Sequence, residues 1–204
     1  YAAGSLLLTA IYTALVVWIV GLAVPVTASY IICAVIAAPA LIKLGVPDFA
    51  AHMFIFYYAV LSEVSPPTAL SPFAASAITG GDPYKTTMQC WKYTLPAFLV
   101  PFLFVLAPAG QGLLLMGSIE ALAKADWWSI AGMTALAAAG IFALAIGFQG
   151  WFAVRTTTLE RVLFIGAGFA LVYPDPVFSA VGGALVLVAL ASHWRRRRMA
   201  AEPA

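Results

Sequence analysis

Charged residues are scarce in this chain: they make up only 9% of its 204 residues, whereas 64% are hydrophobic. A soluble domain carries about a quarter charged residues, so the composition excludes an ordinary soluble protein and indicates an integral membrane protein. The few charges are clustered, and none lies in 1–42, 64–81, 93–119 or 127–154. Gaps of this length match α-helices that cross a hydrocarbon core about 30 Å thick.

Cysteine and catalytic motifs are also lacking. The two cysteines, Cys33 and Cys90, stand alone and form neither a disulfide framework nor a metal motif, so we expect both to be packing residues. No nucleophile–base pair, metal cluster, phosphate loop or dinucleotide fingerprint is present, so we expect no catalytic residue, no enzyme activity and no cofactor. Any energy coupling would then come from a gradient of Na⁺ or H⁺.

Targeting signals are lacking at the start of the chain. No basic region precedes the first apolar run and no small-residue cleavage pattern follows it, so we expect no signal peptide. The chain begins at Tyr1 without methionine, and we expect it to be the C-terminal piece of a longer protein. The basic C-terminal tail has no interleaved aromatic residues, which predicts a topology anchor and no nucleic-acid partner.

Two proline-centred polar breaks interrupt the apolar stretches, one at 21–27 and one at 62–68. Lipid supplies no hydrogen bonds, so unwound backbone at membrane depth must be buried in protein or line a cavity. Two interrupted segments that lie close together in one chain are the best sequence indication of a transporter's ion and substrate site.

The first break divides two apolar arms, 5–20 and 26–44, which would be roughly 24 Å and 28 Å long as helices. Both are slightly short for a membrane crossing. They predict a re-entrant helical hairpin over 5–44 with its tip at 21–27, although two ordinary spans joined by a tight turn would also fit.

The second break lies near the centre of 49–79, a segment that would be about 46 Å long as one unbroken helix. The prolines of Ser65-Pro66-Pro67-Thr68 remove backbone donors and disfavour a continuous helix. We therefore expect carbonyls around 61–64 to face a cavity and to suit a cation. A second half-helix starting at 67–68 would offer N–H groups to a carboxylate. A purely structural proline kink is the alternative.

The remaining segments are predicted from hydropathy and charge. An interfacial helix is expected at 84–92 and a polar loop at 119–126, with spans at 93–109, 127–147, 159–173 and 177–194. The positive-inside rule places the tail that starts at Arg195 in the cytoplasm. Each predicted span reverses the side of the membrane, and counting the spans back from the tail places the open end of the hairpin on the periplasmic side. His52 is expected to be interfacial and His193 incidental.

The candidate ion- and substrate-binding residues are those of the two breaks. They are Gly21, Pro25, Thr27, Ser62, Glu63, Ser65, Pro66, Pro67 and Thr68. Glu63 is the only carboxylate placed near mid-membrane, where it would couple transport to Na⁺ or H⁺, or face a water-filled vestibule. A Na⁺ ion would be held by Ser62, Ser65, Thr68 and backbone carbonyls near Gly21.

The residues at 21–30 resemble the Gly-Met-Gly-Leu-Pro-Thr-Thr-Ala-Ala-Tyr segment of fused TRAP (tripartite ATP-independent periplasmic) transporter permeases. The resemblance continues through 52–57, 61–70, 73–75, 80–83 and 95–108. It is specific in the Pro-Pro block and covers 1–109, whereas 110–204 is similar only to the extra C-terminal helices of some of these permeases. Val26, Ser65 and Thr68 depart from the usual Thr, Thr and Val, so a ligand role of position 26 is in doubt.

The resemblance implies that 1–109 is the C-terminal part of the M-type subunit, an all-α integral membrane fold whose elevator-type transport domain has a re-entrant hairpin and a discontinuous helix. Residues 110–204 would add three accessory spans with a cytoplasmic tail. It implies a bacterial inner-membrane permease that imports a small organic anion by Na⁺ or H⁺ coupling. Its partners would be a periplasmic TAXI-type binding protein, the N-terminal remainder of the permease and membrane lipids. A non-transporting scaffold or docking subunit is the alternative.

Overall fold

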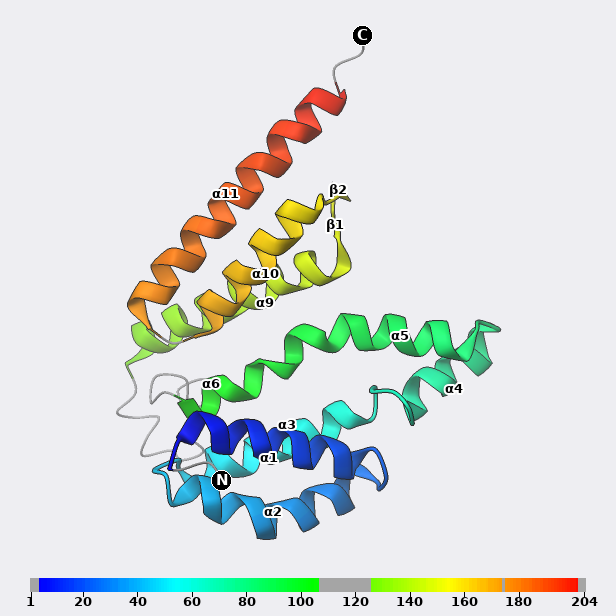
Figure 1. The fold of residues 1–204 in the computed structure, drawn as a ribbon, viewed down its shortest axis with the longest axis vertical. Coiled ribbons are helices and arrows are strands. Elements are labelled where there is room, and N and C mark those ends of the chain that lie inside the picture. The colour runs from blue at the N-terminus through cyan, green and yellow to red at the C-terminus, as the bar shows by residue number, and fades with distance from the viewer. Residues whose placement is uncertain (1–3, 107–125, 174, 202–204) are drawn as a thin grey trace. The chain divides into compact units, whose positions relative to one another are not determined.

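The computed structural model describes residues 4–106, 126–173 and 175–201, and they divide into two compact units, Tyr1–Ile130 and Ala131–Ala204 (Figure 1). The secondary-structure elements in the described part of the first unit are all helices, joined by short turns. Its elements are α1 (Leu6–Gly21), α2 (Val26–Ile42), α3 (Asp48–Ser62), α4 (Leu70–Thr79), α5 (Pro83–Thr94), the 3₁₀ turn η1 (Leu95–Phe98) and α6 (Val100–Leu106).

Helix α3 is the centre of the first unit, because α1, α2 and α6 all pack against it. Its Phe54 and Ile55 are fully buried, and small residues such as Ala50 and Ala59 let the neighbouring helices approach closely. The consecutive helices α1 and α2 lie side by side as a hairpin (Figure 1). Beyond α3 the chain continues into α4, which pairs with α5.

The segment from α5 to α6 differs from the predicted division into an interfacial helix and a separate span. The chain stays helical from Pro83 to Leu106 and is long and apolar enough to cross a membrane as one element. Pro96 lies in η1 and Pro101 in α6, and because proline cannot donate a backbone hydrogen bond, the helix tightens there into a 3₁₀ turn instead of ending. Residues 107–109 of the predicted span lie outside the described part, as does nearly all of the loop at 119–126.

The second unit holds most of α9 (Trp127–Gln149), then a tight hairpin of β1 (Trp151–Phe152) and β2 (Val154–Arg155), then α10 (Thr158–Val172) and α11 (Pro176–Ala201). Ile130–Gln149 and Pro176–Arg197 are long and apolar enough to cross a membrane. Helix α10 has 15 residues, shorter than a crossing needs, so the span predicted at 159–173 stays a prediction.

Glycines hold the helices of the second unit close together. A Cβ at Gly168 would overlap the Leu144 side chain of α9 and lie 2.9 Å from the carbonyl oxygen of Gly140. A Cβ at Gly182 of α11 would lie 3.0 Å from the carbonyl oxygen of Ala167 in α10. Such small-residue contacts are the usual way in which membrane helices approach one another.

We expect Gly168→Ala to destabilise the second unit by about 1–3 kcal/mol, because the methyl group must push α9 and α10 apart. The matched control is Gly166→Ala on the same helix, where a Cβ would meet nothing within 4 Å. The measurement is unfolding of the purified full-length protein by SDS titration. Equal midpoints for the two variants would contradict the close approach of α9 and α10.

A buried ionic cluster joins α10 to the start of the basic tail. Glu160 is 1% exposed, and the side chain of Arg196 donates to its two oxygens at 2.8 Å and 3.2 Å. His193 is fully buried, with Nδ1 3.3 Å from the same carboxylate and Nε2 2.5 Å from the carbonyl oxygen of Phe152. The prediction that His193 is incidental is therefore wrong. His193 is part of the contact between α11, α10 and the β-hairpin.

Candidate functional site

The hairpin tip forms because α1 ends at Gly21 and α2 cannot start before Pro25. The N–H of Ala23 closes the end of α1 by donating to the carbonyl oxygen of Val20 at 3.0 Å. Pro25 stands at the N-cap of α2 with extended backbone, where its missing N–H costs nothing. The tip is thus the short stretch between Gly21 and Val26.

The second break lies between α3 and α4, at the two prolines. Helix α3 ends at Ser62, and the carbonyls nearest the break are used locally: the Ser62 hydroxyl donates to Ala59 at 2.6 Å and the Ser65 hydroxyl to Leu61 at 2.8 Å. Short hydroxyl side chains often bond back to the preceding helical turn in this way. Of the carbonyls at 61–64 that we expected to face a cavity, that of Leu61 instead accepts from the Ser65 hydroxyl, and a cation role for this stretch of carbonyls stays a prediction.

Helix α4 begins at Leu70, later than the predicted start at 67–68. The residue before it, Ala69, is fully buried with φ of +35°, in the left-handed region that a residue with a Cβ seldom adopts. This conformation turns the chain from the proline segment into α4. Pro66 and Pro67 therefore belong to the turn and not to the second half-helix.

The two breaks meet at a cavity of about 310 Å³. Five consecutive residues of the hairpin tip form one wall, and three residues around the second break form the other. The lining residues are Gly21, Leu22, Ala23, Val24 and Pro25, with Glu63, Thr68 and Leu70. All of them belong to the first unit.

Four of the nine candidate residues line this cavity: Gly21, Pro25, Glu63 and Thr68. The other five do not. Ser62 and Ser65 are fully buried beneath the break, with their hydroxyls turned towards the α3 backbone. Thr27, Pro66 and Pro67 are not among the lining residues, and Thr27 and Pro67 are exposed.

Gly21 makes the closest contact between the tip and the break. A Cβ at this position would overlap the hydroxyl of Ser62, would lie 2.8 Å from the Ser62 Cβ, and would lie 3.3 Å from the hydroxyl oxygen of Ser29. Both serines are fully buried. Glycine is thus required here by close packing of the hairpin on the end of α3.

The cavity offers one carboxylate, one hydroxyl and backbone groups in an otherwise apolar wall. Within the described ranges, no three histidine, cysteine, aspartate or glutamate side chains lie together as a metal-ligand group. A cation would therefore be held by the Glu63 carboxylate with hydroxyl and carbonyl oxygens, the oxygen ligands that hard cations prefer. The N–H groups of Leu70 and Ser71 at the start of α4 have no acceptor within the helix and suit an anion; Pro72 has no N–H, and the N–H of Phe73 donates to the carbonyl oxygen of Ala69.

Sequence reasoning missed Leu70 as a lining residue and Ala69 as the residue that turns the chain. It also missed that Ser29 packs beside Gly21, although a serine in an apolar helix one turn after a break is a usable signal. His52, which was predicted to be interfacial, is half-buried, and its Nδ1 lies 3.0 Å from the hydroxyl of Tyr30.

These features define a membrane-embedded helical protein whose two helix breaks converge on a cavity, as in secondary transporters. Residues 2–110, more than half of the chain, match the family model described as tripartite ATP-independent periplasmic transporter, DctM component, and the chain belongs to this family. No curated protein and no solved structure matches the chain.

Proposed function

We propose that the chain is the permease part of a TRAP transporter that imports a small organic anion, driven by a Na⁺ or H⁺ gradient. The family supports a membrane component of such a transporter. The single observation that carries the finer proposal is the cavity at which hairpin tip and helix break meet. A scaffold subunit needs no cavity between two breaks, whereas a transporter needs one.

In this proposal the two sides of the cavity have different tasks. Glu63 binds the coupling cation or proton, because a carboxylate in an apolar wall is stabilised by a cation or a proton. The hydroxyl of Thr68 and the N–H groups of Leu70 and Ser71 hold the substrate carboxylate. Ser62 and Ser65 act beneath the surface by fixing the end of α3, and a Na⁺ role for their oxygens stays a prediction.

The wider assembly follows from the same proposal. A TAXI-type periplasmic binding protein delivers the solute, and the remaining N-terminal part of the permease completes an elevator-type transport domain. The protein lies in the bacterial inner membrane with its C-terminus in the cytoplasm. The basic residues from Arg195 onwards support this orientation by the positive-inside rule.

The test is uptake into proteoliposomes that contain the full-length permease, with the periplasmic binding protein outside. Radiolabelled dicarboxylates, keto acids and amino acids are offered with a Na⁺ gradient, an H⁺ gradient or none. We expect uptake of one of these carboxylates only with a gradient and only with the binding protein. Uptake that is equally fast without either gradient, or no uptake in any condition, would contradict the proposal.

Thr68→Val is expected to lower uptake about fivefold, which corresponds to one hydrogen bond of about 1 kcal/mol. The change removes the hydroxyl and keeps the shape of the side chain. The matched control is Ser71→Ala, since Ser71 lies in the first turn of α4 but does not line the cavity. Loss of uptake in the control alone would contradict this assignment and indicate that the anion binds at the other face of α4.

A further inference from the structure

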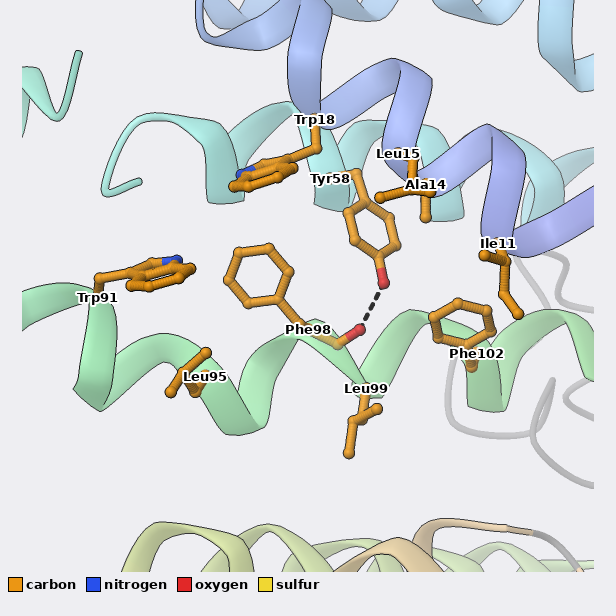
Figure 2. A pocket seen from close by; sticks show the side chains of 10 residues that line it. All are labelled: Ile11, Ala14, Leu15, Trp18, Tyr58, Trp91, Leu95, Phe98, Leu99 and Phe102. Atoms are coloured by element: carbon orange, nitrogen blue, oxygen red, sulfur yellow. Dashed lines mark hydrogen bonds between the residues drawn. The ribbon is translucent and has the colours of Figure 1, made fainter. Parts of the chain in front are cut away.

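The first unit contains a second cavity that is unsuited to a charged lipid headgroup. It has a volume of about 350 Å³ and lies between α1, α3 and the segment from α5 to α6 (Figure 2). Its lining is aromatic and aliphatic, and Trp18 in its wall lies one turn before the hairpin tip, at membrane depth. No charged side chain lines it, so a headgroup would lose its hydration there without gaining a partner. A headgroup site is therefore expected at the end of a span.

Arginines gather at one end of the second unit. The exposed ones come from three elements that are separate in the sequence: Arg155 of β2, Arg161 of α10, and Arg195 and Arg197 of α11. Hydrogen bonds hold these elements together. The Arg196 side chain donates to the carbonyl oxygen of Arg155 at 2.8 Å, and the Arg161 side chain donates to that of Gly147, near the end of α9, at 3.0 Å. Figure 1 shows the β-hairpin next to the start of α10.

Acids do not balance these charges in the described part of the second unit. Its two acids are Glu160 and Asp175. Glu160 is buried and contacts Arg196 and His193. Asp175 lies at the opposite end of α11, where it accepts from the backbone N–H of Val177 at 2.8 Å. The surplus positive charge therefore lies on the four exposed arginines.

The arginines lie at the level of the lipid headgroups. Two candidate spans, Ile130–Gln149 and Pro176–Arg197, end at this part of the second unit. Trp194 lies about 27 Å along α11 from its start, close to the roughly 30 Å thickness of the hydrocarbon core. Trp151 and Trp194 are 60% and 57% exposed, and exposed tryptophans are enriched at membrane interfaces. The arginines that follow Trp194 thus lie just outside the hydrocarbon core.

Two of the exposed arginines lie at the junction of the β-hairpin and α11. Arg197 comes one turn after His193, on the helix face whose imidazole contacts the carbonyl oxygen of Phe152 in β1. Arg155 lies in β2 of the same hairpin. Within the described residues, neither arginine forms an ion pair. Both guanidinium groups are therefore available to an anion at the membrane surface.

We propose that this end of the second unit binds the phosphate of an anionic membrane phospholipid, with Arg155 and Arg197 as the main contacts. Guanidinium groups pair with phosphate oxygens through two parallel hydrogen bonds. Basic clusters at the ends of spans attract anionic lipids in this way. Arg161 and Arg195 add to the attraction. The bound lipid bridges the β-hairpin and the end of α11, and this role is independent of transport.

The test is native mass spectrometry of the full-length protein in mild detergent, titrated with dioleoyl phosphatidylglycerol or dioleoyl phosphatidylcholine. The two lipids share their acyl chains and phosphate, but only phosphatidylglycerol carries a net negative charge. We expect phosphatidylglycerol to bind about tenfold more tightly, and we expect high salt to reduce this preference. Equal affinity for the two lipids would overturn the proposal, whether or not any variant is stable.

The variants locate the site. Arg155→Gln and Arg197→Gln should each lower the affinity for phosphatidylglycerol about fivefold and leave that for phosphatidylcholine unchanged. The matched control is Lys43→Gln, which removes the same charge from an exposed residue at the end of α2. Unfolding by SDS in lipid-free detergent checks that the variants are folded. Unchanged affinity in both arginine variants, or an equal loss in the control, would overturn the assigned site.

Discussion

Replacing Gly21 with alanine is expected to lower uptake by roughly 5–150-fold while the protein still inserts into the membrane. The added methyl group would overlap the hydroxyl of Ser62 and approach its Cβ to 2.8 Å, so the hairpin tip must move away from the end of α3. Overpacking of this kind costs about 1–3 kcal/mol. This corresponds to a roughly 5–150-fold lower population of the arrangement in which the hairpin tip packs on the end of α3. Because the cavity lies between the tip and the break, opening this contact changes the cavity itself.

The measurement is gradient-driven uptake in proteoliposomes, at protein levels matched by immunoblot. A second-site change provides the sharper control: Ser62→Gly removes both atoms that the new methyl group would meet most closely. The double variant Gly21→Ala/Ser62→Gly should therefore regain part of the lost uptake. Full activity of Gly21→Ala, or no recovery in a double variant that is otherwise stable, would contradict the assigned packing.

The positions of the helix breaks could be predicted from the sequence, because proline and glycine act locally. The backbone of Pro25 and the two prolines at 66 and 67 cannot donate hydrogen bonds, and helices α1, α2, α3 and α4 begin or end around them. The convergence of the two breaks on one cavity, in contrast, could not be predicted from these local rules. A pattern of polar interruptions shows where backbone is irregular, but it does not show which irregular segments touch.

Side-chain roles within the break were the least predictable part of the site. A serine near a helix end can point into a cavity or bond back to the preceding turn, and nothing in the sequence distinguishes the two for Ser62 or Ser65. Ala69 gives no signal, because alanine is not expected at positive φ. In the second unit, Thr157 and Glu160 do show the spacing of a capping box, but the contact of Glu160 with His193 spans 33 positions and needs the fold.

The buried ionic cluster of Glu160, His193 and Arg196 gives the second prediction with a large effect. Glu160→Ala is expected to destabilise the second unit by about 3 kcal/mol. The carboxylate is 1% exposed and accepts from Arg196, from the backbone N–H of Thr157 at 2.9 Å and from the hydroxyl of Ser192 at 3.4 Å. Removing one partner of a buried ion pair costs about 3–5 kcal/mol, and the lower value applies because the Arg196 side chain is 38% exposed and can reach water.

The loss should be local, because the lost contacts join the start of α10, the β-hairpin and the end of α11. Hydrogen exchange of the full-length protein should therefore become about 150-fold faster in 150–162, the factor that corresponds to about 3 kcal/mol, with little change in α3. Arg197→Ala is the matched control, since it removes an exposed charge one position beyond Arg196. Unchanged exchange in Glu160→Ala would show that the buried cluster does not hold α11 to α10. Equal acceleration in the control would show that the charge of the tail, and not the buried cluster, holds the two helices together.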